Sequence, residues 1–387
     1  ASIKAEAQID WGDVKARQKF LNSVVTDADR LLEIGRQALT AHAPESDEHK
    51  KVTEAAQLLA QSLLQDVERK PEGASIKEGV SPDRVISVHD PEMRHGRKSK
   101  AKRFDGHKAA VAVDPESQLI TAVAVLAGNA PDNQQALELV EQTEENAQVE
   151  VEETIGDCAY GDGTTRQGFA DAGRKLVAKV PDRPNSAQIP KEDFRIDLEN
   201  KTCTCPGGQE CQTLESIGRR NDRNGESQEW MGFKFDAQVC AVCELRGQCV
   251  RAGPGKGRTV SLHPQESLLQ EARAFQRSEA FSPYCELRQA AEHRIARLMQ
   301  LGMRQARYFG RVKTLYQLLM AAMVANLTLV ATKIGLMGGR GSGRYHLFAP
   351  IVGAMMAFIT TVTPSIAHSL GLTPENSARK AGFRPGF

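Results

Sequence analysis

The stretch V149-E-V-E-E-T-I-G-D-C-A-Y-G-D162 carries the pattern that decides the fold. Its first residues alternate apolar and acidic side chains, which is the period of a β-strand. Asp157 follows directly, at the carboxyl end of the expected strand, where an open α/β sheet presents its chemistry. Asp162 precedes a glycine and two threonines, so it is better explained as a turn residue or a helix N-cap. Because an aspartate after a strand is more often a cap, Asp157 needs further evidence before it counts as catalytic.

The segments around this stretch predict an α/β fold. A hairpin is expected first, then a helix, the strand that ends at Asp157, a short helix and a last strand, over residues 107–113, 119–127, 132–146, 149–157, 165–172 and 175–180. This order is typical of a ribonuclease H-like mixed sheet flanked by helices, although it lacks an opening strand before the hairpin. Another α/β layer fold is the alternative.

The remainder of the chain divides by composition. We expect a helical segment, a basic loop, the first part of the core, a Cys-rich β insertion, the last core helices, and a Gly-rich linker with a tail, over residues 1–70, 71–106, 107–182, 183–282, 283–335 and 336–387. The periodicity predicts one continuous helix over 283–313. The chain begins with Ala and shows no signal peptide, so a processed or truncated N-terminus is expected. Its apolar runs are too short or too polar for membrane spans, which favours buried helices.

Most of the cysteines lie in the insertion. They are Cys203, Cys205, Cys211, Cys240, Cys243 and Cys249. Such clustering without a secretion signal favours a metal site in a reducing compartment over disulfides. Closely spaced thiolates on tight turns suit tetrahedral Zn²⁺. We predict the ligands Cys205, Cys240, Cys243 and Cys249, with Cys203 and Cys211 as substitutes. The alternative is a set of free buried thiols.

A net charge of +1 conceals two basic clusters, over residues 94–108 and 288–313. Basic clusters on a nearly neutral protein suggest a polyanionic partner, whereas two solvated faces are the plain alternative. The candidate DNA-binding residues are Arg97, Lys98, Lys100, Lys102, Arg103, Arg304, Arg307, Arg311 and Lys313. Within the second cluster Glu292 is the one acid, four residues after Arg288. The two could form an ordinary surface ion pair, or Glu292 could be a metal-binding carboxylate at a nucleic-acid surface.

Several short motifs, weak singly but specific in their order and spacing, resemble those of bacterial insertion-sequence transposases with a DDE catalytic domain. They occupy residues 90–98, 106–114, 129–132, 156–162, 288–296 and 302–308, and the resemblance covers roughly residues 10–330. It implies that Asp157 is the second catalytic acid and Glu292 the third. It further implies that both hold Mg²⁺ or Mn²⁺, and that Arg288 orients Glu292 or a phosphate. In many relatives a Lys stands where this chain has Met299.

The first acid of the family lies on an opening strand that the sequence does not show. It is expected to have been lost with the missing N-terminus, and Asp90 is a poor substitute because it lies in a loop. The resemblance implies Mg²⁺-dependent cleavage and strand transfer at transposon ends and target DNA, by a homodimer in the bacterial cytoplasm near the nucleoid, without a membrane. Without the first acid, this fragment is expected to bind DNA but to cleave it poorly or not at all. The alternatives are a non-catalytic DNA-binding remnant with a structural zinc site, and a nuclease that never joins strands.

Overall fold

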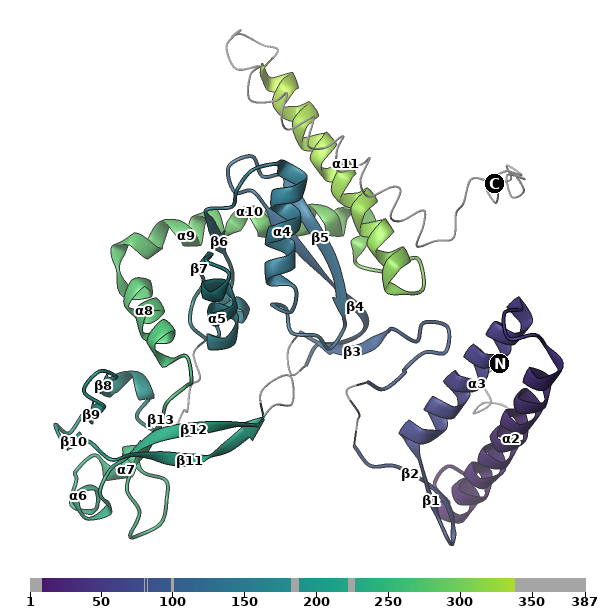
Figure 1. Ribbon diagram of the computed structural model, residues 1–387, viewed down its shortest axis with the longest axis horizontal. Helices are drawn as coiled ribbons and strands as arrows, with labels where there is room; N and C mark the ends of the chain where they lie inside the picture. The colour runs from purple at the N-terminus through teal and green to yellow at the C-terminus, as the bar shows by residue number, and fades with distance from the viewer. Residues whose placement is uncertain are drawn as a thin grey trace.

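A computed structural model describes residues 9–79, 81, 83–98, 101–181, 188–221 and 227–337 as a mixed α/β protein with several small sheets (Figure 1). The chain begins with the predicted helical pair, α2 (Val14–Ala41) and α3 (Asp47–Asp66). Side chains of Asp13 and Ser46 cap their first turns. A small hairpin follows, β1 (Val67–Lys70) and β2 (Gly73–Ile76), across the expected boundary between the helical segment and the basic loop.

From β4 onward the central part confirms the expected order of strand, strand, helix, strand, helix, strand, and a short strand, β3, precedes it within the segment expected to be a loop. Its elements are β3 (Arg94–Arg97), β4 (Arg103–Val113), β5 (Ile120–Ala127), α4 (Ala136–Ala147), β6 (Glu153–Ile155), α5 (Gly163–Asp171) and β7 (Lys175–Val177). Strands β3, β4 and β5 form an antiparallel sheet, and β6 pairs in parallel with β7. The Asp162 carboxylate accepts hydrogen bonds from Thr164 and Thr165 N–H, so Asp162 is the N-cap of α5 as predicted.

The β4–β5 hairpin is covered on both faces, because successive side chains of a strand point to opposite sides. The small residues Ala110, Ala122 and Ala124 pack with Leu139 of α4. The intervening valines Val111 and Val123 pack instead against the last long helix, α11 (Arg311–Met337). Figure 1 shows α4 and the C-terminal helices on opposite sides of these strands. This alternation identifies the middle layer of a three-layer core.

Two local predictions in this region were wrong. The strand before Asp157 covers only Glu153–Ile155, since its only partner among the described strands, β7, is equally short. The helix expected to begin after Asp132 begins after Gln135 instead. Asp132 does not cap it, because its carboxylate lies 2.8 Å from Lys108 Nζ. In both places a tertiary partner overrides the local signal.

The helix predicted over 283–313 is interrupted. The chain forms α9 (Ser282–Leu287), α10 (Gln289–Leu298), a π-helical turn over Met299–Met303, and then α11. Gly302 at φ 92° and Gly310 at φ 86° adopt a left-handed backbone that glycine accepts without strain. The chain therefore turns between α10 and α11, and the basic residues Arg304 and Arg307 lie on that turn. Over Arg311–Ile334, α11 is long and apolar enough to cross a membrane, yet one face packs on β5.

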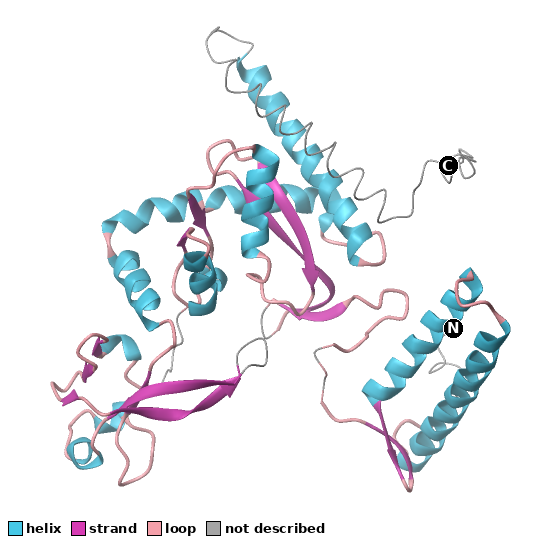
Figure 2. Cartoon of the chain, in the orientation of Figure 1, coloured by secondary structure: helices cyan, strands magenta, loops and turns pink. Residues whose placement is uncertain are grey.

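The part of the chain expected to be an insertion packs around a core of its own. It contains two three-stranded sheets, one of which includes the long β11–β12 hairpin that Figure 2 shows. Its elements are η2 (Lys191–Asp193), β8 (Arg195–Asp197), β9 (Thr202–Thr204), β10 (Glu210–Cys211), β11 (Leu214–Asn221), β12 (Ser227–Lys234), α6 (Ala237–Ala241), α7 (Arg246–Cys249) and β13 (Thr259–Ser261). Phe194, Phe233 and Cys203 are buried at its centre. The helix α8 (Glu266–Arg277) and the turn η3 (Glu279–Phe281) lead back to α9.

Candidate catalytic site

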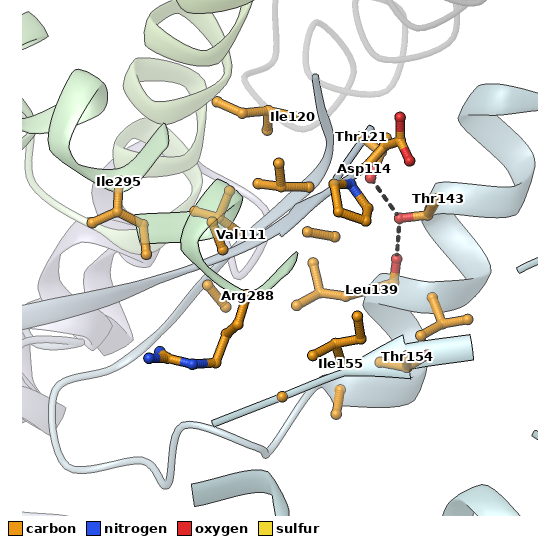
Figure 3. A pocket seen from close by; sticks show the side chains of 18 of the residues that line it. Val111, Asp114, Ile120, Thr121, Leu139, Thr143, Thr154, Ile155, Arg288 and Ile295 are labelled. Carbon is orange, nitrogen blue, oxygen red and sulfur yellow. Dashed lines mark hydrogen bonds between the residues drawn. The ribbon is translucent and has the colours of Figure 1, made fainter. Parts of the chain in front are cut away.

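A cavity of about 1680 Å³ lies between β4 and β6. Residues of α4 and of the α9–α10 junction line it on the two sides of the sheet layer, and Figure 3 shows Val111, Ile155, Leu139 and Ile295 around it. On the α4 side the Thr121 and Thr143 hydroxyls lie 3.0 Å apart, and Thr143 donates to Leu139 C=O. Aliphatic side chains such as Val111, Leu139 and Ile295 make much of the lining apolar.

Asp157 lines this cavity just beyond the end of β6. Its Oδ1 accepts a hydrogen bond from Ala159 N–H at 2.8 Å, so it caps the turn η1 (Cys158–Tyr160) while its side chain stays exposed. Burial raises the pKa of the Tyr160 phenol to about 12, and the charges of Asp157 and Asp132 act in the same direction. Because Asp157 caps η1 and still lies exposed at the cavity, its role as a cap is compatible with a catalytic role.

Glu292 lies in the first turn of α10 and lines the same cavity. Its Oε1 is 2.6 Å from a guanidinium nitrogen of Arg288, and both side chains are partly exposed, at 55% and 39%. Arg288 is labelled among the lining residues in Figure 3. An exposed pair of this kind contributes little to stability. Its two members are therefore free to serve a ligand.

The structure brings Asp157, Glu292 and Arg288 to one cavity, but it does not show a closed metal site. Within the described parts of the chain, no group of three or more His, Cys, Asp or Glu side chains is placed to hold a metal ion. Carboxylate oxygens are suitable donors for Mg²⁺, which usually takes one or two carboxylates and keeps several waters. The donor chemistry of Asp157 and Glu292 therefore fits the ion.

Asp90 lies in a loop, as predicted, and does not line the cavity. It is nevertheless only 1% exposed, and its Oδ2 is 3.0 Å from His107 Nε2. Burial works against the charged carboxylate, but hydrogen bonds from Gly310 N–H and from His107 outweigh it and lower the pKa of Asp90. The other ring nitrogen of His107, Nδ1, is buried without a hydrogen-bond partner in the described structure. No sequence pattern indicates this pair.

The last helices contribute a second contact that sequence reasoning missed. The hydroxyl of Tyr284 on α9 donates to Glu153 on β6 at 2.8 Å, and Lys175 on β7 forms an ion pair with the same carboxylate. The hydrogen bond from Lys175, followed by the one from Tyr284, lowers the pKa of Glu153. This contact fixes the start of the α9–α10 segment against β6, and so helps to place Arg288 and Glu292.

The predicted DNA-binding residues lie in two separate groups. Arg97, Lys98, Lys102 and Arg103 flank the β3–β4 turn, and Arg304, Arg307, Arg311 and Lys313 flank the turn before α11; all are exposed. Arg311 is engaged, because its Nε is 2.9 Å from Glu92 Oε1. Lys100 lies outside the described residues. Arg97 and Lys98 also line the cavity.

The cysteines of the insertion are neighbours. A Cβ placed on Gly207 would lie 3.5 Å from Cys243 Sγ and 3.6 Å from Cys205 Sγ. Burial raises the pKa of the Cys249 thiol, and charges on Cys240, Cys205 and Cys243 would raise it further. All four predicted zinc ligands therefore lie in one region, although they do not form a closed ligand set among the described residues. The thiols are of the type that Zn²⁺ prefers.

Comparison with known proteins gives one match. Residues 204–331 match the family model described as a transposase DDE domain. This range includes Glu292 and most of the insertion, and it begins after Asp157. No curated protein and no solved structure matches the chain. The match supports a protein of the transposase class, with DNA as its partner.

Proposed function

Because the chain carries a transposase DDE domain, we propose that it cuts and joins DNA strands in a reaction that depends on Mg²⁺ or Mn²⁺. The observation that carries the proposal is that Asp157 and Glu292, far apart in sequence, line one cavity together with Arg288. The ribonuclease H-like arrangement is part of the proposal. Support for it comes from the β4–β5 hairpin, the alternation of α4, β6, α5 and β7, and the helices on both faces.

Each residue has a chemical role in this proposal. Asp157 and Glu292 would hold the divalent ions, whose chemistry is to activate the attacking water or 3′-hydroxyl and to stabilise the leaving oxygen. Arg288, 2.6 Å from Glu292, would orient that carboxylate. The basic residues on the two turns would bind the DNA backbone and fix its position rather than read its sequence. We further propose that the protein acts on transposon ends as a homodimer in the bacterial cytoplasm. The insertion would depend on zinc.

A non-catalytic DNA-binding remnant is the second candidate. It is favoured by one observation, that no group of three acids gathers among the residues with described positions. The two candidates predict the same DNA binding but different chemistry. The sequence of the DNA ends is not needed to separate them, because binding to the backbone is independent of sequence.

The test combines a gel shift on a random DNA duplex with nicking of a supercoiled plasmid. The purified chain is assayed with Mg²⁺, with Mn²⁺ and with EDTA. Metal-dependent nicking supports the transposase chemistry. Binding without nicking under all three conditions supports the remnant. Absence of binding at low salt excludes both.

We expect Arg307→Ala to weaken DNA binding and to reduce its salt dependence. Arg307 is exposed on the turn before α11, and each phosphate contact contributes about 0.9 to the slope of log K against log salt. The gel shift is repeated over a series of salt concentrations. Lys51→Ala, which removes an exposed charge from α3, is the matched control and should change neither value. An unchanged slope for Arg307→Ala would place the DNA elsewhere.

We expect the insertion to bind Zn²⁺ and to depend on it for stability, since metal binding energy in such a site is folding energy. Cys243→Ser should lower both the zinc content and the melting temperature of the purified protein. Cys158→Ser is the control, because Cys158 is exposed outside the insertion. Metal analysis and thermal melting with and without a chelator provide the measurement. A protein free of zinc that melts identically in chelator would show that the thiols are simply buried.

A further inference from the structure

An arginine lies on the buried face of α10. Ala290, Arg294 and Leu298 are four residues apart, so their side chains share one face of the helix. Ala290 and Leu298 are buried, and Leu298 packs with Ile120 and Leu318, which belong to β5 and α11. The half-buried Arg294 therefore stands where an apolar side chain would continue the pattern of this face.

The charge of Arg294 is not neutralised within the described structure. Its Nε is buried there and has no hydrogen-bond partner. Burial lowers the pKa of the Arg294 guanidinium, the charge of Arg297 lowers it further, and no carboxylate is among the causes of the shift. Glu292, the only acid of α10, is paired with Arg288 instead. Because a buried charge without a partner is destabilising, a role other than stability would explain the presence of Arg294.

Other arginines that are withdrawn from solvent have partners. Arg166 is more deeply buried, but its guanidinium donates to two backbone carbonyls. Arg258 also has an unbonded Nε, yet its two outer nitrogens donate to backbone carbonyls at 2.8 and 3.0 Å. Arg174 donates to both carboxylate oxygens of Glu144. Arg294 thus differs from the arginines that serve the fold in the described part of the chain.

The position of Arg294 links the cavity to the basic turn before α11. Arg288, at the start of α10, lines the cavity, and Arg304 and Arg307 lie on the turn that follows this helix. Arg294 and Arg297 lie between these two places. At 1.5 Å per residue, the distance along the axis from Arg288 to Arg297 is about 14 Å. The helix therefore carries positive charge from the turn to the cavity.

We propose that Arg294 and Arg297 form a phosphate-binding site that holds the backbone of a DNA strand along α10. A planar guanidinium binds phosphate through two parallel hydrogen bonds. Within the described structure, the recorded partner of Arg297 is a neutral one, the Gln300 side chain at 3.2 Å. A bound phosphate would supply the partner that Arg294 lacks. Arg294 would be a positioning residue, because it fixes the strand relative to Glu292 without touching the reacting atoms.

The identity of the ligand as DNA rests on the proposed function, whereas the unpaired guanidinium does not. Substitution by methionine separates binding from structure, since it keeps an unbranched stem and removes both the charge and the unbonded Nε. We expect Arg294→Met to melt at or above the temperature of the unchanged protein, because an apolar side chain suits this face. The same variant should bind a random DNA duplex about tenfold more weakly or worse, as the loss of a charged hydrogen bond predicts.

Arg166→Met is the matched control for burial. It should lower the melting temperature, because two backbone carbonyls lose their donor. An unchanged DNA affinity for Arg294→Met would show an arginine whose stem packs while its head is hydrated. A fall in its melting temperature like that of Arg166→Met would show a structural arginine. Either result overturns the site.

The salt dependence of the gel shift adds a readout that packing would not change. Arg294→Met should reduce the slope of log K against log salt by about 0.9, the contribution of one phosphate. Arg294→Lys, which keeps the charge but not the planar fork, should retain the slope. Lys51→Ala is again the control for an exposed charge. A slope that Arg294→Met leaves unchanged would contradict a phosphate contact.

A second probe keeps this site separate from the proposed function. If the unchanged protein binds no DNA, the proposed function fails, and melting in the presence of inorganic pyrophosphate then decides about the site. A ligand that binds the folded state raises the melting temperature. Pyrophosphate that stabilises the unchanged protein but not Arg294→Met would support an anion site at α10. Equal shifts for both proteins, or no shift for either, would overturn it.

Discussion

Whatever metal-dependent nicking of a supercoiled plasmid the chain shows without the family's first acid is expected to be abolished by replacing Asp157 with Asn or Glu292 with Gln. Both side chains line the cavity between β4 and β6, and both would hold the divalent ions. Charge stabilisation by such an ion contributes several kcal/mol, and each 1.36 kcal/mol or so corresponds to a factor of ten in rate. A decrease of roughly a thousandfold or more follows for each variant.

DNA binding by the same variants should be nearly unchanged, because a carboxylate without its metal repels phosphate rather than binding it. Gel shifts run beside the nicking assay separate the two effects. Asp171→Asn, which alters an exposed carboxylate at the end of α5, is the matched control and should nick normally. Undiminished nicking by the double variant Asp157→Asn, Glu292→Gln would refute the assignment of both residues.

The second large effect is expected from Asn326→Leu, which should destabilise the core. Asn326 on α11 is 7% exposed, and its amide bonds to both backbone groups of Ile120 at the start of β5. The oxygen accepts from Ile120 N–H at 2.9 Å, and the nitrogen donates to Ile120 C=O at 2.8 Å. Leucine has a similar size but no polar atoms. Each backbone group left without a partner costs roughly 1–3 kcal/mol. When both backbone groups of Ile120 lose their partner, the free energy of unfolding should fall by about 2–6 kcal/mol.

Urea unfolding monitored by circular dichroism gives the free energy of unfolding for this comparison. Leu327→Ala is the control, because the neighbouring Leu327 is 48% exposed and should tolerate truncation. Surface changes usually alter the free energy of unfolding by less than about 0.5 kcal/mol. A decrease no larger than that for Asn326→Leu would show that water replaces the amide as the partner of Ile120. It would then follow that α11 is held on β5 by apolar packing alone.

Local patterns in the sequence predicted the order of the central elements. The alternation of side chains along strands and helices shows within short stretches of the chain. The helical pair at the N-terminus and the N-cap at Asp162 could be read in the same way. The transposase resemblance rested on short motifs in order, and the family match over 204–331 supports it. The zinc ligands and the individual DNA-binding residues stay predictions.

Tertiary structure decided what depends on distant partners. The shortness of β6 follows from its pairing with β7, and the break after Leu298 follows from a glycine at positive φ that helical periodicity does not reveal. No local pattern could place Asp157 and Glu292 at one cavity, because their positions depend on contacts such as Tyr284 with Glu153 across 131 residues. The burial of Asp90 against His107 is likewise non-local, since the pair forms only where the chain returns along β4. The sequence by itself therefore determined the order of the central elements, and packing determined where they end and which side chains meet.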